Sequence, residues 1–211
     1  MANSGSNCDS TRHREHAPVL HECPDCLFLT PDPEFKDGTV PCPACGSTGA
    51  TRRTVPAKHL RRFDERIRNY HREGEHEIVV ILAATFLETV FEDMLARMMQ
   101  AGGAEKRVIE LVLDTERSVG LRLGKLFPTL TGEKFEEVAT KNGHAEFPRR
   151  WREMRSARNA FIHGESFQDP RESLDERMAC EAMSLLDEAY DLFLVVNNRF
   201  VAKAPAARLR G

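Results

Sequence analysis

The sequence predicts a mainly α protein, in which a bundle of five helices follows a small β zinc ribbon. Four of the six cysteines lie in two C-x-x-C pairs within the first 50 residues, a spacing typical of a four-thiolate zinc site. From residue 58 onward, apolar residues recur at intervals of three and four, the period of an amphipathic helix. We therefore divide the 211 residues into a flexible N-terminus (1–17), a zinc ribbon (18–52), a helical domain (58–201) and a flexible tail (202–211).

The cysteine pairs, in HECPDC and PCPACG, make Cys23, Cys26, Cys42 and Cys45 the predicted ligands of a structural Zn²⁺. A two-residue gap lets both thiolates of a pair face one ion, and two pairs complete a tetrahedron. The segment between the pairs, LFLTPDPEFKDGTV, predicts a hairpin with a turn at Asp37-Gly38. Two disulfides or four reduced thiols are the alternatives. Disulfides need an oxidising compartment, and no secretory signal points to one.

The ribbon is predicted to be acidic, which bears on its partners. Its only lysine is outnumbered by Glu22, Asp25, Asp32, Glu34 and Asp37. Such a surface repels phosphates, since affinity for nucleic acid rests on Lys and Arg. We therefore expect the ribbon to stabilise the fold or to bind a protein partner.

Glycines and prolines divide the helical part. We predict helices over about 58–73, 75–100, 105–126, 147–163 and 171–200. Gly74 and Gly164 should end the first and fourth, and 139–144 should form a loop. The second helix is apolar on most faces and should be central. The longest apolar run, Ile78 to Leu87, is shorter than the roughly 18 residues of a membrane span, so we expect a cytoplasmic protein without membrane contact.

Charges are segregated along the chain although the net charge is only −3. Residues 149–158 carry five arginines against one glutamate, and residues 171–191 carry seven acidic side chains against two arginines. Segregation of this kind can build a local positive field on a nearly neutral protein. Solvated helix faces with salt-bridge partners would give the same pattern, so both interpretations stay open.

The stretch RSARNAFIHGE places Arg158, Asn159 and His163 just before a glycine. Arginine offers a planar fork of donors that suits phosphate, and histidine gains and loses a proton near neutral pH. Asn159 and His163 are four residues apart and share a helix face. Arg158 and His163 are five apart, so both reach one ligand only if the helix tightens there. On these residues alone, a basic helix with a glycine cap remains the simpler interpretation.

A helical bundle whose penultimate helix carries R-N-x-x-x-H-G resembles the HEPN superfamily (higher eukaryotes and prokaryotes nucleotide-binding domain). The resemblance covers residues 58–201, and the motif is Arg158, Asn159, three residues and His163. Many members are metal-independent endoribonucleases that serve as toxins or antiphage effectors and dimerise so that two motifs meet. Members paired with an antitoxin often continue H-x-Tyr, whereas this chain has Gly164-Glu165 after the histidine.

The resemblance implies a mechanism in which a ribose 2′-OH attacks the neighbouring phosphate and leaves a 2′,3′-cyclic phosphate. His163 would act as general acid or base, Arg158 would stabilise charge on the phosphate oxygens, and Asn159 would bind the phosphate or orient the other two. Glu88 resembles an accessory polar residue of some members, although it could equally lie at the surface or pair with an arginine. The residues expected to approach the RNA are Arg149, Arg150, Arg152 and Arg155.

Two further functions stay open on the sequence. The helical domain could be a non-catalytic module that binds nucleotide or RNA as a regulator. Alternatively, the chain could be an adaptor whose acidic ribbon recruits a protein partner. Metal-dependent hydrolysis is not expected, because four cysteines leave zinc no open position for water.

Overall fold

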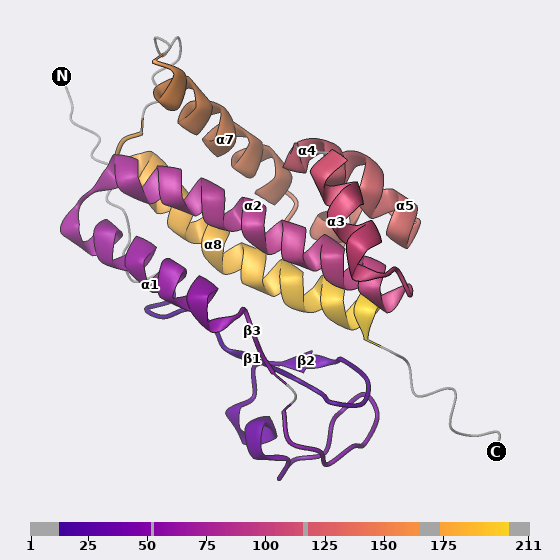
Figure 1. The fold of residues 1–211 in the computed structure, drawn as a ribbon. Helices are drawn as coiled ribbons and strands as arrows, with labels where there is room; N and C mark the ends of the chain where they lie inside the picture. The colour runs from indigo at the N-terminus through magenta and orange to yellow at the C-terminus, as the bar shows by residue number, and fades with distance from the viewer. Residues whose placement is uncertain (1–12, 52, 116–117, 165–173, 203–211) are drawn as a thin grey trace.

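The computed structural model describes residues 13–51, 53–115, 118–164 and 174–202. It is mainly helical, with a small three-stranded antiparallel sheet near the N-terminus (Figure 1). The predicted fold class is therefore confirmed in outline. The predicted number of five helices is wrong, because short helices lie between the third and fourth long ones. Within the described part of the chain, none of the helices combines the length and apolar character that a bilayer crossing requires.

Five long helices form the body of the structure: α1 (Lys58–Glu73), α2 (His76–Ala101), α3 (Lys106–Thr115), α7 (Phe147–His163) and α8 (Glu176–Val196). The short helices are α4 (Val119–Leu121), α5 (Phe127–Thr131) and α6 (Phe135–Lys141). Two π-helical turns, η3 (Arg122–Leu126) and η5 (Asn197–Val201), follow α4 and α8. As predicted, α1 and α7 end where Gly74 and Gly164 adopt positive φ angles, a conformation that glycine adopts without a Cβ penalty.

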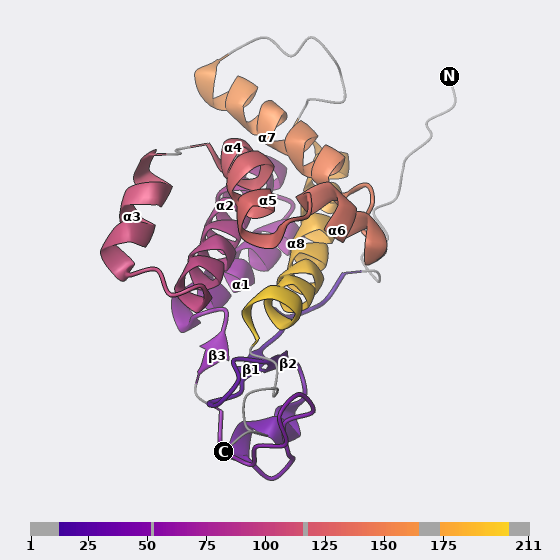
Figure 2. The same ribbon diagram turned by 90° about the vertical axis from the view of Figure 1, so that its right-hand side faces the viewer.

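Helix α2 lies at the centre, as its apolar sequence predicts. It packs along α8, with α1 and α7 against its other sides (Figure 1). The ring of Phe91 lies 5.3 Å from that of Phe135 on α6 and 4.7 Å from that of Trp151 on α7, measured between centroids. Burying one side chain of this size contributes roughly 1.5–3 kcal/mol, so this cluster fixes α6 and α7 on α2. Helix α3 lies at the outside of the bundle (Figure 2).

The predicted third helix, 105–126, is wrong, because α3 ends at Thr115. Ser118 is extended, and the chain then continues through α4 and η3. The guanidinium of Arg122 fixes this return: it donates to the carbonyl of Leu113 at 2.6 Å and to Glu92 of α2 at 2.6 Å. Apolar periodicity runs across the break, so it could not show where the axis turns. The predicted loop at 139–144 is also wrong in part, since α6 extends to Lys141.

The sheet differs from the predicted hairpin between the cysteine pairs. Strand β1 (Leu20–Glu22) pairs with β2 (Leu29–Thr30) on one side and with β3 (Thr54–Val55) on the other. After β2 the chain forms the 3-10 helix η2 (Pro33–Asp37), which buries Phe35 beside the cysteines. The third strand thus comes from the segment between the ribbon and the bundle, beyond the predicted ribbon boundary at residue 52.

The ribbon is fastened to the bundle by buried polar contacts. Arg97 of α2 donates to Glu22 at 2.6 Å and to Asn197 at 2.7 Å. Asn198 then pairs with the backbone of Leu29: it accepts from the N–H and donates to the carbonyl, each at 2.8 Å. Glu22 is fully buried, so it does not belong to the acidic surface that the sequence suggested.

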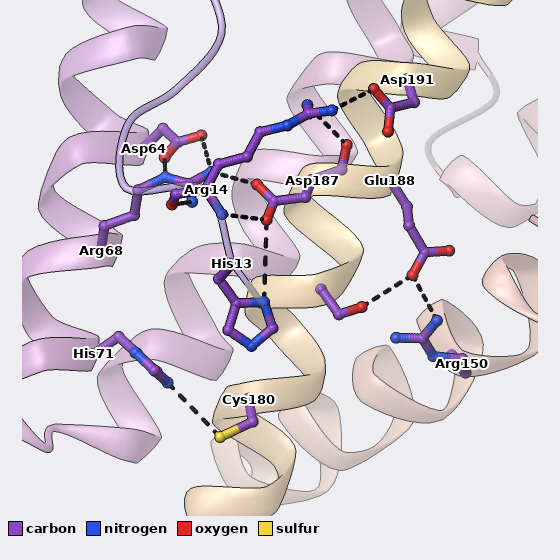
Figure 3. A network of polar contacts seen from close by, with 11 residues as sticks. His13, Arg14, Asp64, Arg68, His71, Arg150, Cys180, Asp187, Glu188 and Asp191 are labelled. Carbon is purple, nitrogen blue, oxygen red and sulfur yellow. Dashed lines mark hydrogen bonds and ion pairs between the residues drawn. The ribbon is translucent and has the colours of Figure 1, made fainter. Parts of the chain in front are cut away.

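A second network joins the N-terminal segment to α1 and α8 (Figure 3). Arg68 pairs with Asp64 on the same helix and with Asp187 on α8, and it also donates to the backbone carbonyl of Arg14. The side chain of Arg14 reaches Asp191 at 2.6 Å, and Tyr190 donates to Asp64 at 2.7 Å. Residue 14 therefore lies bound in the segment that the sequence assigned to a flexible N-terminus; residues 1–12 and 203–211 lie outside the described residues.

The junction makes a stability prediction. Arg97→Met keeps most of the apolar volume but leaves the Glu22 carboxylate, 1 % exposed, with Arg53 as its one remaining charged partner among the described residues. Breaking a buried ion pair costs roughly 3–5 kcal/mol. We expect a loss of that size in the free energy of unfolding, measured by denaturant titration. The double variant Glu22→Gln/Arg97→Met should recover part of it, and equal stability of the single variant and the original chain would contradict the role of the pair.

Candidate functional site

The motif residues Arg158, Asn159 and His163 lie on the last turns of α7. The helix stays α-helical through His163 and ends at Gly164, whose N–H bonds back to the carbonyls of Ala160 and Phe161. The tightening that would bring Arg158 and His163 together is therefore not present. At about 100° per residue, the two side chains leave the helix roughly 140° apart. One chain places Asn159 and His163 on a common face and Arg158 on another.

Arg158 is held by Glu88 of α2, the apolar central helix. Its Nη2 donates to Oε1 of Glu88 at 2.7 Å, and Nε of Arg155 donates to the same oxygen at 3.0 Å. Two guanidinium groups thus share one carboxylate, which leaves one positive charge in excess. The Nε of Arg158 is buried without a hydrogen-bond partner among the described residues. The structure therefore brings Glu88 next to the motif, and one of the two arginines that it binds, Arg158, is a motif residue.

The sequence did not show that Arg155 also donates to Glu88. Arg155 and Arg158 are three residues apart and are therefore neighbours on one helix face. That spacing could have pointed to a shared acidic partner. It could not have identified Glu88, because the partner is 67 positions away from Arg155 in the chain.

The other end of the motif is open to solvent. Asn159 and His163 are exposed, and the side chain of neither one hydrogen-bonds to another described residue. Between them, Phe161 and Ile162 expose 43 % and 55 % of their surface. A pair of large apolar side chains beside a histidine and an amide forms a surface that a partner or ligand can cover.

Three of the four arginines expected to approach RNA have carboxylate partners. Arg149 pairs on α7 itself, with Glu146 and Glu153. Arg150 pairs across to α8, with Glu181 and Glu188, the second of which appears in Figure 3. Burial by itself would lower the pKa of Arg150, and these two carboxylates raise it.

Among the four arginines, the remaining one, Arg152, is exposed and has no ion-pair partner in the part of the chain that the structure describes. Most of the positive charge counted in residues 149–158 is thus balanced by acidic side chains. The acidic partners come from α7 itself, from α8 and from α2.

The four predicted zinc ligands lie together in the ribbon. The Sγ atoms of Cys23 and Cys45 are 3.7 Å apart, as are those of Cys26 and Cys42, and all four lie within 4.8 Å of one another. A disulfide joins its sulfur atoms at about 2.05 Å, so these pairs are not disulfides. Four sulfurs at about 2.3 Å from a central zinc would be roughly 3.8 Å apart. The cluster could therefore hold a metal ion.

Both cysteine pairs use the same turn. Leu27 and Gly46, each directly after a C-x-x-C pair, have φ angles of 66° and 72°. Their N–H groups donate to the carbonyls of Cys23 and Cys42, respectively. Each C-x-x-C pair therefore lies within one closed turn. Glycine adopts this conformation without a Cβ penalty, whereas Leu27 adopts it at a steric cost. Burial raises the pKa of the Cys23 and Cys26 thiols, and a cation bound there would displace their protons.

The shared carboxylate makes a prediction for stability. Glu88→Ala leaves the partly buried guanidinium groups of Arg155 and Arg158 side by side without their common acceptor. We expect a loss of about 1–2 kcal/mol in the free energy of unfolding, measured by denaturant titration. Glu65→Ala, which removes an exposed carboxylate of α1, is the matched control and should change stability by less than about 0.5 kcal/mol. An equal effect of both variants would show that the shared contact adds no stability.

We find no match to this chain among protein-family models, curated proteins or solved structures. The resemblance to the HEPN superfamily therefore rests on the motif and on the order of the helices.

Proposed function

We propose that the chain is a metal-independent endoribonuclease of the HEPN type whose active site is completed by a second copy of the chain. The observation that carries the proposal is the state of the three motif residues. Arg158 is fixed by Glu88, while Asn159 and His163 stand exposed at the helix end beside Phe161 and Ile162. A second α7 that covers these apolar side chains would supply the arginine that one chain holds away from its own histidine.

In the proposed reaction, the ribose 2′-oxygen forms a bond to phosphorus and the bond from phosphorus to the 5′-oxygen breaks. The products are a 2′,3′-cyclic phosphate and a 5′-OH. His163 would take the 2′-OH proton or protonate the leaving oxygen. Arg158, oriented by Glu88, would stabilise the negative charge on the phosphate oxygens. Asn159 would donate a hydrogen bond to the same phosphate.

The test is cleavage of labelled RNA by the purified full chain in excess EDTA. We expect fragments that end in 2′,3′-cyclic phosphate, with His163→Ala and Arg158→Ala each reducing the rate by at least about 100-fold. Arg66→Ala is the matched control, because it removes an exposed arginine of another helix, α1. It should leave the rate nearly unchanged. Cleavage that survives both motif substitutions would overturn the assignment.

The second copy is tested by mixing the two inactive variants. When the two variants pair at random, half of the dimers are mixed. If Arg158 of one chain works with His163 of the other, each mixed dimer has one intact site. Symmetric pairing then predicts roughly a quarter of the original activity. A mixture as inactive as its components would contradict the shared site while leaving the two single-variant results to stand by themselves.

A second candidate function is supported by the paired arginines. Arg149, Arg150 and Arg155 are already bound by carboxylates, which weakens the positive field that a long RNA would meet. This favours a regulator that binds a nucleotide or a short RNA segment without cleaving it. RNA binding that persists while no variant or condition yields cyclic phosphate ends would support this function over the nuclease.

We further propose that the cysteine cluster binds Zn²⁺ and that the ion is structural. Four thiolates fill a tetrahedral zinc site, so the ion would have no open position for water or substrate. Its contribution would be to hold the two C-x-x-C turns together. The exposed acidic residues that could then receive a basic protein partner are Asp32, Glu34 and Asp37.

Metal removal tests the zinc proposal. Elemental analysis should find about one Zn²⁺ per chain in the purified protein. Cys26→Ser should lower the metal content and the melting temperature, because the metal supplies much of the folding free energy of so small a unit. Cys180→Ser, a cysteine substitution on α8, is the comparison for metal content and should not change it. A metal-free protein that melts like the original would contradict the proposal.

A further inference from the structure

A cavity of about 100 Å³ lies beside α7, between that helix and the segment formed by α4, η3 and α6. Figure 2 shows α4 next to α7 on this side of the bundle. The apolar part of the cavity wall is formed by Leu123, Phe135 and Pro148. An engineered apolar cavity of about 150 Å³ holds a benzene molecule. A cavity of this size that is also open to solvent therefore has room for most of a flat ring.

The polar groups of the cavity are almost all donors. Arg152 and Arg155 line it from α7, and they are neighbours on one helix face. Arg152 has no ion-pair partner among the described residues. Arg155 gives its Nε to Glu88, and its Nη1 lies so close to Gly120 that a Cβ there would be 3.3 Å away. The Nη1 of Arg155 thus lies beside Gly120, which also lines the cavity.

The same wall contains an aromatic ring that its neighbours hold in place. Trp151 lines the cavity and is only 4 % exposed. Its ring is fixed by Phe91 and by the guanidinium of Arg155, 5.6 Å from the ring centroid. Yet its Nε1–H is buried without a hydrogen-bond partner in the described structure. This nitrogen exposes almost no surface, so Trp151 contributes its ring to the cavity wall.

From these groups we propose that the cavity binds an organic anion with a flat ring and a phosphate or carboxylate group. The ring lies against Leu123, Phe135 and Pro148, and the anionic group accepts from Arg152 and Arg155. Glu136, the one acidic residue of the wall, comes from α6 and would repel an anion placed beside it. The anionic group is therefore held at the α7 side. This site is distinct from the motif residues, and its ligand can be a free small molecule or one nucleotide of a strand.

The protein carries its own reporter for this site, because Trp151 is its only tryptophan. Tryptophan fluorescence of the full chain is recorded during titration with uridine monophosphate, benzoate and inorganic phosphate. A fourth probe is a short oligonucleotide with methylated 2′-OH groups, which the proposed nuclease reaction cannot cleave. Binding is thus measured without catalysis, so failure of the nuclease proposal leaves this test intact.

Two variants are matched to the lining. A Cβ added at Gly124 meets no atom within 4 Å, so Gly124→Leu places apolar volume at the cavity without a backbone clash. It should abolish the saturable response. Arg152→Gln should weaken binding at least about fivefold, as expected for the loss of one charged hydrogen bond. Arg66→Gln removes the same charge from α1, outside the cavity, and should leave the affinity unchanged.

The outcomes separate clearly. A saturable response to uridine monophosphate or benzoate that follows this variant pattern supports a free ligand. The same pattern with the oligonucleotide alone supports a nucleotide of a strand. The proposal is overturned if no probe changes the fluorescence, if the response persists in Gly124→Leu and Arg152→Gln, or if inorganic phosphate alone gives the full response.

Discussion

The burial of α2 is the constraint on which the rest of the structure depends. This helix is apolar on nearly every side, and α8, α1 and α7 together remove it from water. A charged side chain on such a helix is stable only where a partner reaches it. Glu88 and Arg97 both meet this condition: Glu88 pairs with Arg155 and Arg158 of α7, and Arg97 pairs with Glu22 of the ribbon. Two charges on one helix thus mark where the motif and the ribbon attach.

Acidic α8 plays the complementary part. Its Asp187 and Asp191 hold the N-terminal segment and α1, while Glu181 and Glu188 hold Arg150 of α7. The charge segregation of the sequence is therefore used largely inside the molecule, between neighbouring helices. What remains for an external anion on α7 is concentrated at Arg152 and at the unshared nitrogens of Arg155 and Arg158.

The features that the sequence could predict are those with local causes. Gly74 and Gly164 end their helices because glycine tolerates a positive φ, and the cysteine spacing places four sulfurs together because each pair forms its own turn. The break after Thr115 and the strand at Thr54–Val55 have no such local mark. Both depend on contacts with distant residues, Arg122 with Glu92 in one case and β3 with β1 in the other. At the site, the residue types suggested the motif. The contact of Glu88 with Arg155 and Arg158 could not be predicted, because these residues are 67 and 70 positions apart in the chain.

The fastening of the ribbon by Asn198 bears on how the chain comes to be folded. Leu29 and Asn198 are 169 residues apart, and Arg14 and Asp187 are 173 apart. Contacts between such distant positions close late, after much loop entropy has been overcome. During synthesis, the cysteine turns could gather a metal ion as soon as residue 45 has left the ribosome. Their seat on the bundle, however, does not exist until α8 has been made. The contacts of Leu29 with Asn198 can therefore form only when nearly the whole chain has been made.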